Sequence, residues 1–208
     1  MSKRQIQTKA GFTIIEVVLV LAIAGLIFMM VFLALPALQR AQRDTQRADD
    51  IARLQAAINS YQANNRGRLP EGNNGMVLVN QSTGKADTLK GATKWADFYN
   101  RYVIVGTGAA ADVFEDPSGG PYALYINDCS SVTTAGADCA KQPAKWEFDK
   151  QAAGASEYYG EANAGLKNVI LITLNAICNG EEVKKATGAR KVAITYKKEG
   201  GGTVCLNN

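Results

Sequence analysis

The hydrophobic positions of the chain fall into three successive patterns. Residues 12–38 form an almost unbroken apolar run in which the only charged residue is Glu16. From there to about residue 65, apolar residues recur every three, four or seven positions, the stripe of a helix buried on one side. The stripe residues are Leu38, Ala41, Ala48, Ile51, Leu54, Ile58 and Tyr61. Beyond residue 66, shorter apolar runs alternate with segments rich in Gly, Asn, Asp and Pro.

The first two patterns together predict one continuous helix over residues 13–65, ending before Gly67 and Pro70. As a helix, residues 12–38 would be roughly 40 Å long, which is enough to cross a hydrocarbon core of about 30 Å. The whole helix would be roughly 80 Å long. A domain of the size that remains cannot bury it alone, so the exposed part needs lipid or other subunits.

The amphipathic continuation, residues 39–65, carries many charges on its other faces. A solvated helix face is the simplest interpretation of this run, and charge pairing between subunits is the alternative. The charged residues are Arg40, Arg43, Asp44, Arg47, Asp49, Asp50 and Arg53.

Residues 66–208 are expected to form one small globular head. A short helix near residues 93–102 and short strands at 103–105 and 122–126 are indicated. The strongest predicted strands come late and are β-branched, at residues 168–178, 191–197 and 203–206. Their close spacing predicts an antiparallel meander with one face packed on the long helix. The expected fold class is therefore α+β: a long N-terminal helix on a small antiparallel sheet.

The distribution of positive charges predicts the orientation of the chain across a membrane. The formal net charge is +4, and Lys3, Arg4 and Lys9 contribute three of the positive charges. Because these residues precede the apolar run, the N-terminus should stay cytoplasmic and everything after residue 38 should be translocated. An ordinary secretory signal has an apolar region of only about 7–15 residues, followed by a cleavage site, so the apolar run of residues 12–38 is too long for one. On hydropathy alone, a plain signal anchor remains the alternative.

The string KAGFTIIEVVLVLAIAGL resembles the prepilin signature of type IV pilins and type II secretion pseudopilins. The resemblance covers about the first thirty residues. It implies that residues 1–11 are a short leader, that a prepilin peptidase cuts after Gly11, and that the new amine of Phe12 is methylated. It also implies that Glu16 directs assembly by meeting the Phe12 amine of an adjacent subunit, and that the mature chain has the type IV pilin fold. Pairing of Glu16 with the Phe12 amine of its own chain and a tolerated interfacial glutamate are the alternatives.

The same resemblance places a helix-weakening glycine at Gly25, but the usual proline would fall at Leu33. Here the proline is Pro36. Inside a helix, Pro36 removes one backbone hydrogen bond and clashes with the carbonyl of residue 32. We expect Gly25 and Pro36 to mark the section where the helix kinks or melts, although its position departs from the family pattern.

The four cysteines are expected to form disulfides, since the topology places the head outside the cytoplasm. Four cysteines allow three pairings. We favour Cys129–Cys139, which closes a local loop, and Cys178–Cys205, which would join neighbouring late strands. Loop entropy gives about 3 and about 3.5 kcal/mol respectively. The second bridge also resembles the C-terminal disulfide loop of many pilins.

Little in the sequence supports catalysis or cofactor binding. The chain has no histidine, which excludes His-dependent triads and His metal ligands. Glu115, Asp116 and Asp128 offer calcium-type oxygens, but the acidic spacing matches no EF-hand loop. No metal or cofactor is therefore expected. No specific nucleic-acid partner is expected either, because the net charge of the mature chain would be near zero.

We therefore expect a non-enzymatic pilin, anchored in the cell membrane by one span and later polymerised into an extracellular type IV pilus. Its expected partners are other pilin subunits, the prepilin peptidase, the inner-membrane assembly platform and membrane lipid. Adhesion, twitching motility or DNA uptake are the roles that such a fimbrium would serve. A type II secretion pseudopilin is the close alternative, and a signal-anchored extracellular enzyme is the alternative from another class.

Overall fold

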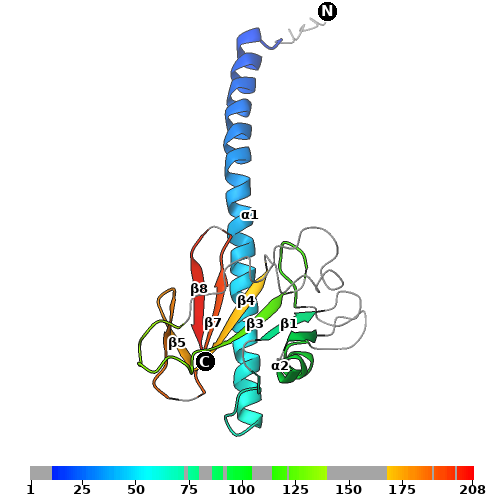
Figure 1. Cartoon of the computed structure of the whole chain (residues 1–208). Coiled ribbons are helices and arrows are strands. Elements are labelled where there is room, and N and C mark those ends of the chain that lie inside the picture. The colour runs from blue at the N-terminus through cyan, green and yellow to red at the C-terminus, as the bar shows by residue number, and fades with distance from the viewer. Residues whose placement is uncertain are drawn as a thin grey trace, which may run out of the picture. The chain divides into compact units, whose positions relative to one another are not determined.

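The structure is a computed structural model that describes residues 11–72, 75–79, 86–90, 93–104, 114–120, 122–139, 168–188, 190–199 and 201–208. The chain divides into two compact units, one up to Gln42 and one over Arg43–Asn208, here called the globular unit (Figure 1). Helix α1 (Ile14–Asn64) contributes to both. Residues 1–10 of the expected leader lie outside the described residues.

Helix α1 matches the helix predicted over residues 13–65 to within one residue at each end. Its C-terminus closes as predicted near Gly67. Arg66 takes a left-handed conformation with φ of 54°, and the Gly67 N–H donates to the Gln62 carbonyl at 2.7 Å. This is the 6→1 bond of a Schellman motif, which satisfies a carbonyl that the helix leaves open.

A six-stranded sheet in the order β2-β1-β3-β4-β7-β8 forms the body of the globular unit (Figure 1). Its strands are β1 (Gly75–Val79), β2 (Ala86–Lys90), β3 (Ala123–Asp128), β4 (Val169–Leu174), β7 (Val192–Lys197) and β8 (Thr203–Asn207). The strands β4, β7 and β8 are antiparallel neighbours, as the sequence predicted. The α+β class is thus confirmed, with an apolar N-terminal helix and a small sheet.

The centre of the sheet differs from the expected all-antiparallel arrangement. Strands β3 and β4 are parallel, with Leu124 opposite Ile170 and Ile126 opposite Ile172. A parallel pair needs a crossover connection of a dozen or more residues, and the chain between Asp128 and Val169 is long enough to supply it. The expectation of a purely antiparallel sheet was wrong at this pair.

The strand predicted over residues 168–178 is in fact two strands in two sheets. Asn175 lies between β4 and β5 (Ala176–Asn179) with φ of 55°, which turns the chain out of the main sheet. The Asn175 amide holds this bend by donating to Asp128 Oδ1 at 2.8 Å. Strand β5 then pairs with β6 (Glu182–Lys185) in a separate two-stranded sheet.

The helix predicted near residues 93–102 is present, whereas the strand predicted from Val103 is not. Helix α2 (Thr93–Phe98) runs into a π-helical turn, η1 (Tyr99–Val103). Val103 is fully buried there, and its carbonyl accepts a hydrogen bond from Arg53 Nη2 at 2.8 Å. Burial in the core rather than pairing in a sheet explains its apolar character; residue 105 lies outside the described residues.

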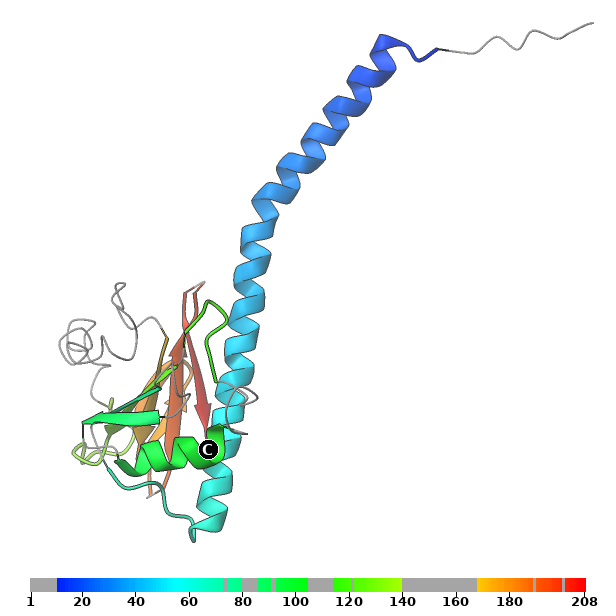
Figure 2. The same ribbon diagram turned by 90° about the vertical axis from the view of Figure 1, so that its right-hand side faces the viewer.

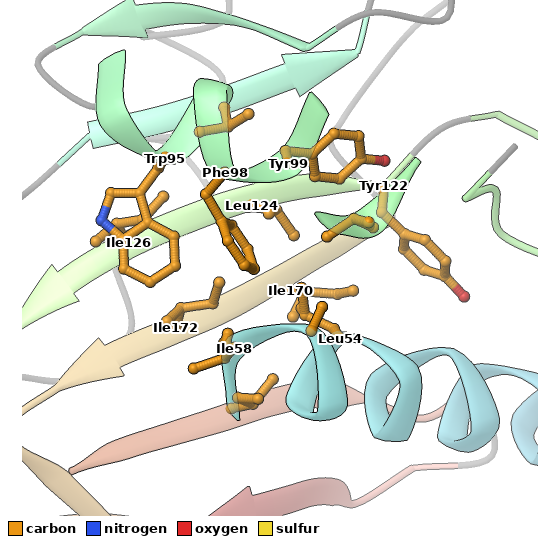
Figure 3. Packing of buried hydrophobic residues seen from close by; sticks show 14 of the residues in the cluster. Leu54, Ile58, Trp95, Phe98, Tyr99, Tyr122, Leu124, Ile126, Ile170 and Ile172 are labelled. Atoms are coloured by element: carbon orange, nitrogen blue, oxygen red, sulfur yellow. The ribbon is translucent and has the colours of Figure 1, made fainter. Parts of the chain in front are cut away.

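One hydrophobic core lies between the sheet and the two helices (Figures 2 and 3). In Figure 3, Leu54 and Ile58 of α1 point toward Ile170 and Ile172 of β4, and all four are fully buried. Aromatic rings of α2 and η1 complete this core, and the ring of Tyr61 contacts that of Phe98 at 5.6 Å. Alternate strand residues therefore face α1 and α2 on the same side of the sheet.

A smaller cluster lies on the opposite face of the sheet. There Ala193 of β7 packs with Ala176 of β5, Cys129 and Cys139. The loop that ends at Cys139 also pairs with β6, because the Cys139 N–H donates to the Val183 carbonyl at 3.1 Å. The β5–β6 hairpin is thereby fixed against the main sheet.

Candidate functional site

None of the described residues packs around the apolar start of α1. Every large apolar side chain from Phe12 to Leu38 is exposed, the least exposed being Leu35 at 47%. Among the described residues α1 is the one helix long and apolar enough to cross a membrane, and none of its most apolar stretch is buried. A continuous apolar surface of this kind marks contact with lipid or with another protein.

The single carboxylate of this segment is held at the helix start by Thr13. The Thr13 N–H and the Thr13 Oγ1 hydroxyl each donate to Glu16 Oε2, both at 2.8 Å. In return, Thr13 Oγ1 accepts a hydrogen bond from the Glu16 N–H at 3.4 Å. Thr13 and Glu16 thus form a capping box, which satisfies backbone donors that the first helical turn leaves open.

No side chain of the same chain was expected from the sequence as a partner of Glu16. The partner is the hydroxyl of Thr13. The signal was present in the sequence, since Thr followed three residues later by Glu, just before an apolar run, is the capping-box pattern.

Neither Gly11 nor Gly25 is required by packing within the chain. A Cβ added at either position would meet nothing within 4 Å, so the described residues offer no steric reason for glycine there. Both Gly25 and Pro36 lie inside continuous helix, and local melting or kinking at these positions stays a prediction. Phe12 is 89% exposed, immediately before the capping box.

Where α1 enters the globular unit, its polar face is bound rather than solvated. Arg47 is 4% exposed. Its guanidinium donates two hydrogen bonds to the Asp116 carboxylate, from Nε at 2.6 Å and from Nη2 at 2.8 Å. The remaining donors reach Asp44, Ser118 and Glu199 at 3.0, 3.2 and 3.3 Å. All five N–H donors of the guanidinium are therefore matched.

Further charges of the same face bind the globular unit. Arg43 pairs with Glu199 in the β7–β8 turn at 2.8 Å, and Asp50 accepts a hydrogen bond from the Tyr122 hydroxyl at 2.9 Å. The interpretation as a solvated helix face was therefore wrong for Arg47, while Arg43 and Asp50 are partly exposed and also bind other residues of the chain. Sequence reasoning missed their role because their partners lie far away along the chain.

Electrostatics at this junction follow from burial and pairing. Burial alone would raise the pKa of Asp116, but hydrogen bonds from Arg47 and Ser118 outweigh it and hold that pKa below its usual range. Burial raises the pKa of Asp50, and the hydrogen bond from Tyr122 opposes it only partly. Burial also raises the pKa of Tyr122, and the nearby Asp50 carboxylate raises it further.

The acidic residues considered for calcium are used otherwise. Asp116 is bound by Arg47, while Asp128 accepts hydrogen bonds from Asn175 and Ser130. Over the part of the chain that the structure describes, no group of three or more Asp, Glu, Cys or His side chains could hold a metal ion. The three acids are therefore not gathered at one point.

The four cysteines are joined as favoured from the sequence. Cys129 is bonded to Cys139 and Cys178 to Cys205, leaving no free cysteine among the described residues. We expected the second bridge to join neighbouring strands. Instead, Cys178 lies on β5 of the small sheet and Cys205 on β8 of the large one. The bridge ties the small sheet to the large one.

Comparisons with known protein families, with curated proteins and with solved structures find no match to this chain. Its function must therefore be inferred from its own residues. The features that carry the inference are the exposed apolar segment, its single capped carboxylate, and the globular unit, within which Arg47 of α1 binds Asp116.

Proposed function

We propose that the chain is a pilin: a structural, non-enzymatic subunit with the type IV pilin fold that is stored in the membrane and then polymerised into an extracellular filament. The observation that carries the proposal is the apolar segment from Phe12 to Leu38, whose large apolar side chains are all exposed and which contains one charged residue, Glu16. A lipid bilayer covers this surface before assembly. The same segments of other subunits cover it afterwards.

The position of Glu16 supports assembly rather than simple anchoring. A carboxylate inside an apolar span is costly, although less so near the interface than at the centre, and it marks a functional residue by default. No Lys or Arg lies between residues 12 and 39. After cleavage between Gly11 and Phe12, the methylated amine of Phe12 in a neighbouring subunit is the cation that neutralises Glu16 in the apolar core of the filament.

The remaining roles follow the same proposal. The prepilin peptidase removes residues 1–11, the assembly platform in the inner membrane takes up the mature subunit, and Gly25 and Pro36 allow the helix to deform as subunits pack. The globular unit, stabilised by disulfides, forms the outer surface of the filament. Adhesion, surface motility or DNA uptake are the functions that this surface would serve.

The test uses two substitutions that separate the charge of Glu16 from its cap. Glu16→Gln removes the charge but keeps a capping box, since Gln serves at this position as well as Glu. Glu16→Ala removes both. We expect both variants to insert in the membrane and to lose residues 1–11 normally, and both to form few or no surface filaments. Electron microscopy counts the filaments, and mass spectrometry reports cleavage and methylation at Phe12.

Normal filament number in Glu16→Gln would show that the charge does not direct assembly. If the wild-type chain forms no long surface filaments but its deletion blocks protein secretion, the pseudopilin alternative is correct. If the isolated globular unit turns over a substrate, the enzyme alternative is reopened.

A further inference from the structure

The Thr13 hydroxyl binds the Glu16 carboxylate more closely than it caps the helix backbone. As a donor, Thr13 Oγ1 lies 2.8 Å from Glu16 Oε2. As an acceptor, it lies 3.4 Å from the Glu16 backbone nitrogen, which is beyond the usual range of about 2.7–3.2 Å for N–H···O bonds. In an ordinary N-cap, the important bond is the one that the side-chain oxygen accepts from a backbone N–H. Here the hydroxyl serves chiefly the carboxylate.

The two oxygens of that carboxylate are used unequally. Glu16 Oε2 accepts from both the N–H and the hydroxyl of Thr13. Within the described part of the chain, no hydrogen bond reaches Glu16 Oε1. One oxygen is thus fixed at the helix start while the other keeps its acceptor capacity for a group from outside the chain.

Resting on the function proposed above, we infer that Thr13 is a positioning residue for assembly. Its hydroxyl fixes the Glu16 side chain before subunits meet and leaves Oε1 to receive the amine of the neighbouring Phe12. A free glutamate side chain has many rotamers, and fixing them on binding costs free energy. Because Thr13 has already fixed them in the single subunit, less of that cost remains for the filament contact.

Three substitutions at Thr13 separate positioning from capping. Thr13→Ser keeps the hydroxyl. Thr13→Val keeps the shape of the side chain but loses the hydroxyl. Thr13→Gly also loses the hydroxyl, yet glycine is about as good an N-cap as threonine. Each is made in the full chain and expressed in the producing cell, and surface filaments are counted beside membrane insertion and leader cleavage.

We expect Thr13→Ser to assemble like wild type, and Thr13→Val and Thr13→Gly to form about tenfold fewer filaments, which corresponds to the loss of one hydrogen bond to a charged group. Insertion and cleavage should not change. If Thr13→Gly assembles normally, Thr13 is only a helix cap and the inference is overturned. Poor assembly of Thr13→Ser would overturn it as well, because the hydroxyl would then not be what matters.

The Glu16→Gln variant, measured in the same experiment, distinguishes this inference from the proposed function. If Glu16→Gln abolishes filaments while Thr13→Val and Thr13→Gly assemble normally, only the role of Thr13 fails. If Glu16→Gln itself assembles normally, the assembly role of the carboxylate fails and the inference falls with it.

Discussion

Arg47 shows how one residue can join a helix to a sheet. Its guanidinium is almost fully buried against Asp116, whose side chain is completely buried, and it stacks over the ring of Tyr196 at 5.6 Å. Two further carboxylates, Asp44 and Glu199, complete its contacts. A buried charge without partners is strongly unfavourable, so this set of contacts fixes α1 to the globular unit at one register.

The first prediction at this scale concerns Asp116. Asp116→Asn leaves the buried Arg47 without its closest carboxylate, and we expect the free energy of unfolding to fall by about 3 kcal/mol. Glu199→Gln is the matched control, because Glu199 is partly exposed, and the loss of its charge should lower the free energy of unfolding much less. Denaturant unfolding of the full chain in detergent micelles measures both. Equal losses would contradict the central role of the Arg47–Asp116 pair.

The same variant changes the pH dependence of stability. The pKa of Asp116 is lowered in the folded state, so the folded state binds fewer protons than the unfolded state as pH falls below about 4. Its stabilising contribution is therefore complete above that pH and is lost as pH falls through the lowered pKa. In Asp116→Asn, the free energy of unfolding should fall less steeply as the pH is lowered below about 4. An unchanged fall would show that other carboxylates cause it.

At the scale of elements, Asn175 decides that β4 and β5 are two strands. Its positive φ turns the chain, and its side chain holds Asp128 at the end of β3. The Asn175 carbonyl also accepts a hydrogen bond from the Ala186 N–H at 2.9 Å, just after β6. The separate hairpin β5–β6 therefore depends on this one left-handed residue.

Asn175→Gly and Asn175→Ala should separate the backbone effect from the side-chain effect. Both lose the hydrogen bond to Asp128, worth about 1 kcal/mol or somewhat more with a charged acceptor. Alanine additionally resists the left-handed conformation at a cost of roughly 1–2 kcal/mol, whereas glycine does not. We expect Asn175→Ala to be the less stable variant by about 1 kcal/mol in thermal or denaturant unfolding. A glycine variant as unstable as the alanine variant would contradict this account.

The sequence pattern predicted α1, α2, β3, β4, β7 and β8, but not β1 and β2, nor how the elements meet. The stripe through Ile51, Leu54 and Ile58 was enough to predict the second half of α1, and the β-branched runs predicted β4, β7 and β8. The break at Asn175 was missed because no Gly or Pro marks it, and apolar residues stand on both sides. Strand β6 was missed because its sequence, EVKK, has the composition of an exposed loop.

The candidate site was predictable where its signal is local. Glu16 is the only charge in an apolar run, and Thr13 three residues earlier completes a known motif. Burial of Arg47 was not predictable, because its partner Asp116 is 69 positions away. The position of Arg47 on the helix is equally compatible with a solvated side chain. Pairing between charges far apart in the sequence does not alter the periodicity of the hydrophobic residues.

For the whole molecule, the disulfides determine which parts can open independently. Cys178–Cys205 connects the β5–β6 sheet to β8, and the Cys178 N–H also donates to Asn207 Oδ1 at 2.6 Å. Cys129–Cys139 instead closes a loop on one side of the same hairpin. The two bridges therefore constrain the hairpin from different sides.

The prediction at this scale is a local loss of protection. In the double variant Cys178→Ala/Cys205→Ala, amides of β5 and β6 should exchange hydrogen faster, while amides of β4 and β7 stay protected because the core against α1 is intact. The double variant Cys129→Ala/Cys139→Ala is the control, and should expose chiefly the loop of residues 130–138. Uniform loss of protection across the sheet in the first variant would show that the bridge stabilises the whole globular unit.

The parallel pairing of β3 and β4 also has a consequence for the order of folding. A ribosome delivers the chain from its N-terminus, so α1 and β3 are made long before β4, β7 and β8. The buried stripe of α1 has no complete sheet to pack on until residues near Tyr196 have been synthesised, because Ile170, Ile172 and Ile194 form much of its counterpart. Contacts of such large sequence separation slow folding. The chain must therefore keep an amphipathic helix uncovered during most of its synthesis, and its exposure to aggregation is greatest in the time before the core closes.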